Sequence, residues 1–321
     1  MPVVRPVLTH QRAVVLMVLV TLMWSIAGVV TRHLAHARSF EITFWRSFFT
    51  ALSLLVILPL WCGRGVFATL PWRSRVFWLS GCCWSVMFTA FMLALTLTSV
   101  VNVLVTMSVG PLLTALFARL FIGHRLAPRT WIAIVVAGLG IAYMQSAHLG
   151  ATDGRAVSWL GFGVALCVPV AGALQWTLVQ YSQRHARPGV DLPGGNEDGE
   201  PRRQIDLVPS VLIGAVLSCL FTLPFAWPFQ ANGHELALLA LLGLVQLAIP
   251  CVLSMLCATV LKAPEVSLLQ LLEVIFGILL AWLGAGEVPG STVVAGGVVV
   301  ISALVANEVL AWKQRNDRQT A

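Results

Sequence analysis

Glu273 is the ionisable residue that lies deepest in an apolar stretch of this 321-residue chain. It is the eleventh residue of the stretch Ala263–Ala285, and Gln270 and Ser267 precede it by three and six positions on roughly the same helical face. A charged side chain at the centre of a bilayer costs about 2.5–3.5 kcal/mol, so it needs a role there. Either Glu273 binds a substrate amine or a coupled proton, or it is a protonated carboxyl group hydrogen-bonded inside a helix bundle.

Arg46 is the second charge inside an apolar stretch, Phe40–Trp61. It lies near one end of that stretch, so its long side chain could reach the membrane surface. The functional interpretation is a fixed positive charge that holds a substrate carboxylate or an internal partner such as Glu273.

A polar face follows the stretch Val100–Ile122. Asn102, Thr106 and Gly110 recur every four residues, which places them on one side of a helix. Pro111 removes a backbone donor, so the helix is predicted to kink or to free a carbonyl group for a binding site. Two further segments contribute candidates: Trp24 and Gln246 for binding, and Pro250 for a helix break.

Residue patterns for other kinds of chemistry are missing from the sequence. Neither GxxxxGK[ST] nor HExxH occurs, so we expect no ATP-driven transport by this chain alone, no catalytic metal and no cofactor. Only His33 and His36 share a helical face as a possible metal pair. The seven cysteines all lie in or beside apolar stretches and are expected to be packing residues.

We expect the candidate binding residues to lie on helices that cross a membrane. The chain is 58% hydrophobic and only 10% charged, with a mean hydropathy of +0.88, which is more apolar surface than one soluble core can bury. Apolar windows of about twenty residues predict an all-α polytopic membrane protein with ten transmembrane helices. The predicted spans are Val14–Leu34, Phe40–Trp61, Val76–Leu97, Val100–Ile122, Thr130–Ala147, Val157–Val179, Leu207–Pro228, His234–Leu256, Ala263–Ala285 and Ser291–Trp312.

Basic residues predict the orientation. Sixteen of the twenty Lys and Arg residues fall on the side that holds both termini, which is therefore expected to be cytoplasmic. The net charge of +7 comes from short basic clusters between the apolar stretches rather than from one basic face. Nucleic acid is therefore not an expected partner. The N-terminal run Ala13–Val30 is eighteen residues long, longer than the core of a cleaved signal peptide. Residues 184–206 are polar and rich in Gly and Pro, which is typical of a disordered cytoplasmic linker.

The two halves of the chain share a pattern. Gly110-Pro111 and the turn at Gly123 recur 163 positions later as Glu273-Val274 and Gly286, on the fourth and ninth predicted spans. The sequence therefore predicts two five-helix repeats, residues 1–148 and 149–321. Because five is odd, the second repeat must cross the membrane in the opposite sense, as in many secondary transporters.

Several short motifs resemble the EamA-type transporters of the drug/metabolite transporter superfamily over nearly the whole chain. They are Leu22-Met23-Trp24-Ser25, Thr43-Phe44-Trp45-Arg46, Gly110-Pro111 with Gly123, Leu244-Val245-Gln246-Leu247-Ala248-Ile249-Pro250, Leu271-Leu272-Glu273-Val274-Ile275 and Gly286-Glu287. The resemblance implies ten helices, two inverted repeats and transport of small solutes, often export of amino acids. The chain departs from the family's pattern at His124, where Glu is usual, and at Val274, where Pro is common. The second departure predicts an unusually straight ninth helix.

The sequence therefore predicts a secondary transporter in the cytoplasmic membrane that exports a small polar metabolite by alternating access, with a proton as a possible coupling ion. A drug or cation efflux protein and a membrane-embedded enzyme acting on a lipid are the alternatives. The enzyme would need a nucleophile or an acid/base pair near the interface, and the sequence contains no such cluster. Small residues such as Gly277 and Ala281 could pack helices within one protomer or in a homodimer.

Overall fold

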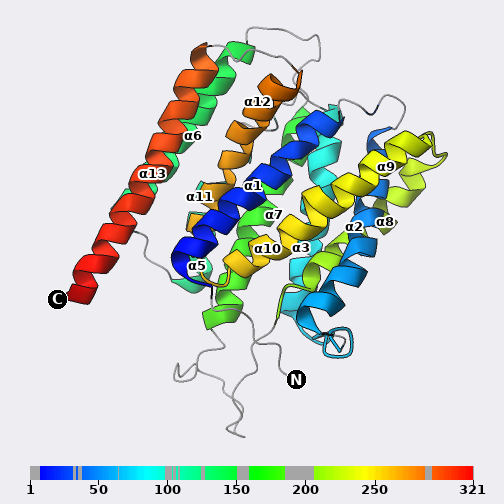
Figure 1. Ribbon diagram of the computed structural model, residues 1–321, viewed down its shortest axis with the longest axis horizontal. Helices are drawn as coiled ribbons and strands as arrows, with labels where there is room; N and C mark the ends of the chain where they lie inside the picture. The colour runs from blue at the N-terminus through cyan, green and yellow to red at the C-terminus, as the bar shows by residue number, and fades with distance from the viewer. Residues whose placement is uncertain are drawn as a thin grey trace, which may run out of the picture.

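A computed structural model describes residues 8–31, 34, 38–63, 65–97, 103, 106–107, 109–123, 127–149, 159–184, 206–285 and 291–320. These residues form helices and connecting turns, and no strand occurs among them (Figure 1). The first half contains α1 (His10–Thr31), α2 (Ser39–Cys62), α3 (Arg75–Leu97), α5 (Gly110–Ile122) and α6 (Pro128–Leu149). The second contains α7 (Trp159–Arg184), α8 (Ser210–Ala226), α9 (Gly233–Leu241), the π-helix η1 (Leu242–Ala248), α10 (Ile249–Cys257), α11 (Ala263–Gln270), α12 (Leu272–Ala285) and α13 (Ser291–Thr320).

Each of the ten predicted spans coincides with a helix or with consecutive helices in the described part of the chain. The boundaries agree within about five residues, except that the fourth span is described as a continuous helix only from Gly110 and that α13 continues past the predicted end at Trp312 to Thr320. The N-terminal end of α1 and the C-terminal end of α13 lie at the same end of the bundle, as an even number of crossings requires (Figure 1). Residues 185–205 of the predicted linker lie outside the described residues.

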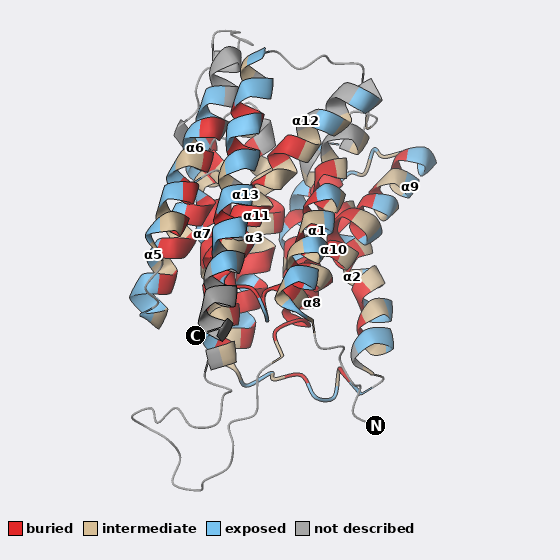
Figure 2. Ribbon diagram, turned by 60° about the vertical axis from the view of Figure 1, so that its left-hand side comes forward, coloured by how far each residue is buried: buried red, intermediate tan, exposed pale blue. Residues whose placement is uncertain are grey.

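Apolar side chains cover the outside of the bundle. Five described helical segments are long and apolar enough to cross a membrane, and four shorter helical segments are also apolar. Large apolar side chains are exposed on these helices, such as Leu60, Leu139 and Leu283, while the buried residues face inward (Figure 2). A protein with exposed apolar side chains all round its helices has lipid as its surrounding solvent. The chain is a multi-pass membrane protein.

The ninth span is not straight, so the prediction drawn from Val274 is wrong. Leu271 forms a turn between α11 and α12, where the Leu271 amide donates to the Leu268 carbonyl at 3.1 Å and the Val274 amide donates to the Leu271 carbonyl at 3.2 Å. These bonds span three residues instead of four, so they tighten the chain locally without needing proline. Both pieces pack on α1, but α11 also packs on α5 and α7, whereas α12 packs chiefly on α1.

Helix pairs repeat when the two halves are exchanged. Replacing each span by its counterpart in the other half turns the contact between α3 and α7 into the contact between α10 and α1. In the same way, α3 with α8 becomes η1 with α2, and α5 with α7 becomes α12 with α1. Both members of each of these three sets are contacts in the structure. The remaining large contacts, α2 with α8 and α6 with α13, join each span to its own counterpart. This pattern is the one that two structurally equivalent halves related by a two-fold axis would have.

A backbone strap crosses the start of α2. Glu41 is buried, and its Oε1 accepts hydrogen bonds of 2.8 Å from the amides of both Gln230 and Ala231. The guanidinium of Arg38 donates to the Pro228 carbonyl at 3.0 Å. Phe229, between these contacts, packs its ring against aromatic side chains of α2. The segment between α8 and α9 is therefore fastened to α2 on both sides of Phe229.

Candidate functional site

Arg46 points into the bundle rather than toward its surface. Only 3% of the residue is exposed, and Nη2 donates to the carbonyl oxygen of Phe88 on α3 at 3.1 Å. Its Nε is buried and has no hydrogen-bond partner among the described residues. A buried guanidinium with a free donor can accept a carboxylate without breaking an existing bond.

Glu273 lies in the first turn of α12, directly after the turn at Leu271. It is half-buried, and it is an electrostatic partner of Arg46. Among the described residues, neither a hydrogen bond nor an ion pair within 4.0 Å engages its carboxylate. The site therefore holds opposite charges from α2 and α12 that influence each other without being joined in a salt bridge.

Trp24, Gln246 and Cys251 surround these charges. The indole N–H of Trp24 donates to the sulfur of Cys251, and Cys251 is an electrostatic neighbour of both Arg46 and Glu273. Gln246, which is 5% exposed, directs Nε2 to the carbonyl oxygen of Trp24 at 3.4 Å, whereas its Oε1 is buried without a partner in the described part of the chain. Arg46 and Gln246 thus leave one unpaired donor and one unpaired acceptor.

The backbone around Gln246 departs from α-helical geometry. Pro250 has no amide hydrogen, so it cannot make the bond that an α-helix would place on the Gln246 carbonyl. The chain forms the π-helix η1 over Leu242–Ala248 instead and returns to an α-helix at Ile249, whose amide donates to the Leu244 carbonyl. Single π-helical segments of this kind are frequent at functional sites. The helix predicted to break at Pro250 continues without interruption through α9, η1 and α10, and only its hydrogen-bonding pattern changes before the proline.

Four other predicted residues lie together between the fourth, sixth and ninth spans. Gly110 is buried, and a Cβ atom on it would lie 3.7 Å from Ser267 Oγ and 3.7 Å from Pro169 of α7. Pro111 occupies the start of α5, where a missing amide hydrogen costs nothing. Gln270 accepts a hydrogen bond from Trp176. Gly110 and Ser267 therefore lie at a packing contact between α5 and α11, and Gln270 joins α11 to α7.

The predicted polar face of the fourth span and the predicted histidine pair lie partly or wholly outside the described residues. Thr106 is described and buried, but Asn102 falls outside the described residues, so the predicted polar face on the fourth span is described only in part. His33 and His36 also fall outside them, and the described residues hold no group of three or more potential metal ligands.

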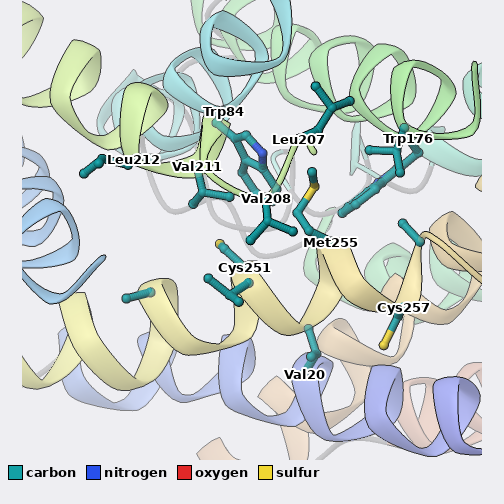
Figure 3. Packing of buried hydrophobic residues seen from close by; sticks show 14 of the residues in the cluster. Val20, Trp84, Trp176, Leu207, Val208, Val211, Leu212, Cys251, Met255 and Cys257 are labelled. Carbon is teal, nitrogen blue, oxygen red and sulfur yellow. The ribbon is translucent and has the colours of Figure 1, made fainter. Parts of the chain in front are cut away.

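Sequence reasoning assigned Cys251 to packing and did not select Phe88. The cysteine is part of a large apolar cluster, and in Figure 3 it points from α10 with Met255 toward the cluster that includes Val208 and Trp84. Its hydrogen bond with Trp24 and its electrostatic interaction with Arg46 depend on how α1, α2 and α10 pack. Phe88 contributes only its main-chain carbonyl group, which no residue type reveals.

Comparison with known proteins identifies the first half of the chain. Residues 11–145 match the EamA-like transporter family, and this range contains Trp24 and Arg46. This part of the chain belongs to the EamA-like transporter family. The matched family is one of transporters rather than enzymes.

Both halves of the chain resemble a solved structure titled "Crystal structure of protein". That structure is similar over 95% of this chain and 99% of its own, with a TM-score of 0.72 and 17% sequence identity. At this identity the likeness shows a shared fold. No curated protein sequence matches the chain.

Proposed function

We propose that this EamA transporter moves a small zwitterionic metabolite, an amino acid or a related compound, out of the cell by alternating access around Arg46 and Glu273. The observation that carries the proposal is that these two charges interact without forming a salt bridge. Arg46 keeps a buried unpaired Nε, and the Glu273 carboxylate makes neither a hydrogen bond nor an ion pair within 4.0 Å in the described part of the chain.

A zwitterion satisfies both groups at once. Its carboxylate would accept from Arg46, and its ammonium group would donate to Glu273 and to the unpaired Oε1 of Gln246. A substrate with only one charge would leave the other protein charge uncompensated in an apolar environment, which is costly. The arrangement therefore favours zwitterions over simple organic cations.

Glu273 is also the candidate for coupling to protons. A proton on its carboxylate would remove the negative charge that holds the substrate ammonium, so proton and substrate would compete for one site. Competition of this kind couples the movement of a solute to a proton gradient.

The architecture supports alternating access. The helix pairs that repeat on exchange of the halves, and the interruptions at Leu271 and before Gly110, favour two inverted repeats of residues 1–148 and 149–321. In the proposed orientation both termini lie in the cytoplasm, as the distribution of Lys and Arg predicts.

Counterflow into liposomes containing the purified protein tests the proposal. The panel would consist of radiolabelled neutral L-amino acids, matched amines that lack the carboxylate and cationic drugs. We expect exchange of one or more amino acids and none of the corresponding amines. Exchange of amines or cationic drugs alone would favour the efflux alternative and contradict a role for Arg46 in holding a carboxylate.

A further inference from the structure

The main chains of α2 and η1 approach one another more closely than side chains normally allow. A Cβ atom on Gly243 would lie 2.6 Å from Phe49 Cβ, 2.9 Å from the amide nitrogen of Thr50 and 3.0 Å from the carbonyl oxygen of Arg46. Two of these atoms belong to the backbone of α2, so no side-chain rotation could relieve the overlap. Glycine at 243 is therefore required by the packing of η1 on α2.

Thr50 fastens the same contact. Its buried hydroxyl lies 2.7 Å from the Arg46 carbonyl oxygen and 3.1 Å from the Gly243 carbonyl oxygen. A hydroxyl has one proton to donate, so the bond is shared between a carbonyl of α2 and a carbonyl of η1. One end of this shared hydrogen bond is therefore the backbone of Arg46, whose side chain carries the buried guanidinium.

We propose that Thr50 and Gly243 are positioning residues that hold Arg46 and Gln246 at one fixed separation. This inference rests on the proposed function and deepens it. Arg46 offers an unpaired donor and Gln246 an unpaired acceptor, each on one of the two helices that the contact joins. A fixed distance between the Arg46 donor and the Gln246 acceptor selects solutes in which the carboxylate and the hydrogen-bond donor are also a fixed distance apart, as they are in α-amino acids.

Variants at both positions test the proposal by counterflow, with the radiolabelled L-amino acid that the wild-type protein exchanges fastest as the probe. Thr50→Val keeps the side-chain shape but removes the hydroxyl, and Gly243→Ala adds the obstructing Cβ atom. We expect each variant to raise KM about tenfold while kcat stays within about twofold. The reason is that the substitution weakens the binding of the substrate equally in the ground state and in the transition state of transport. Thr50→Ser should restore the wild-type KM.

Two controls separate positioning from a general loss of stability. Gly163→Ala on α7 adds a Cβ atom that meets nothing within 4 Å, and it should leave KM unchanged. Thr50→Val should have little further effect in an Arg46→Gln background, since residues that act through one another are not additive.

Three results would overturn the proposal: a normal KM in Thr50→Val, no rescue by serine, or full additivity with Arg46→Gln. If Arg46→Gln leaves amino-acid exchange at the wild-type rate, the proposed function itself is wrong. If Arg46→Gln abolishes exchange and Thr50→Val changes nothing, only the positioning role is wrong.

Discussion

The indole N–H of Trp176 donates a 2.8 Å hydrogen bond to the amide oxygen of Gln270, and so joins α7 to the last residue of α11. Trp176 is buried and packs edge-on against Trp84 of α3, with ring centroids 5.9 Å apart. The bond therefore fixes the position of the turn at Leu271 relative to α3 and α7.

Replacing Gln270 should affect stability more than substrate binding. Gln270→Leu leaves the buried indole N–H without an acceptor, which costs about 1–3 kcal/mol. We expect a lower melting temperature of the purified protein in detergent and a KM within about threefold of wild type. A large rise in KM at an unchanged melting temperature would instead place Gln270 in contact with the substrate.

Glu273→Gln should impair transport without lowering stability. The substitution keeps the size of the side chain and removes its charge, so we expect flux in liposomes to fall about 100-fold, which corresponds to ~2.7 kcal/mol. The melting temperature should not decrease, because the carboxylate makes no hydrogen bond or ion pair within 4.0 Å in the described part of the chain that the substitution would remove.

Glu265→Gln is the matched control for that substitution. Glu265 caps the start of α11 by accepting from the Lys262 amide at 3.1 Å, and glutamine can fill the same capping role. Its flux should match that of wild type. Comparable flux in the two variants would exclude a coupling or binding role for Glu273.

Arg46→Lys tests the guanidinium as distinct from its charge. Lysine has no Nε donor in a planar fork, so it cannot hold a carboxylate with the same geometry while also reaching the Phe88 carbonyl. We expect KM for the exchanged amino acid to rise by about tenfold or more. Equal KM values for the arginine and lysine forms, measured by counterflow, would show that a positive charge alone is sufficient.

The sequence predicted the spans and the two charges because both are local properties of the chain. An apolar window identifies a helix that crosses the membrane, and a charge within it stands out whatever its neighbours are. The resemblance to EamA transporters also directed attention to Trp24 and Gln246. These features needed no knowledge of how the helices pack.

Tertiary packing decided the features that the sequence did not predict. Leu271 is an ordinary helix-forming residue, and the turn there separates α11, which packs on α5 and α7 as well as on α1, from α12, which packs chiefly on α1. The same applies to Gln270, whose spacing from Glu273 suggested a common binding face but whose amide oxygen is taken by Trp176. Gly243 resembles any other glycine until the backbone of α2 is placed beside it.

Gly140→Ala should weaken the contact between α6 and α13. The added Cβ atom would lie 2.9 Å from Val300 Cγ2 and 3.2 Å from the Gly296 carbonyl oxygen. We expect a lower melting temperature, with a loss of about 1–3 kcal/mol from overpacking. Gly138→Ala, on the same helix, meets nothing within 4 Å and should leave the melting temperature unchanged or slightly raised. Equal melting temperatures for both variants would contradict a tight contact at Gly140.

Glu41 variants test the strap between α8 and α9. Glu41→Ala removes the oxygen that accepts from both Gln230 and Ala231, whereas Glu41→Gln retains a carbonyl oxygen at that place. The alanine variant should lose about 2–4 kcal/mol of stability and the glutamine variant less than half of that. The comparison requires only melting curves of the two purified proteins, and identical curves would show that the strap adds nothing.

The contact between α6 and α13 also constrains the order in which the protein assembles during synthesis. α6 packs chiefly against α13, the last helix of the chain, and has few contacts with the helices made before it. After leaving the translocon, α6 packs on α5 but remains without its main partner until the ribosome has finished almost the whole polypeptide. A premature stop before Ser291 would therefore leave a membrane-inserted bundle in which one face of α6 stays unpaired, a feature that membrane quality-control proteases can recognise.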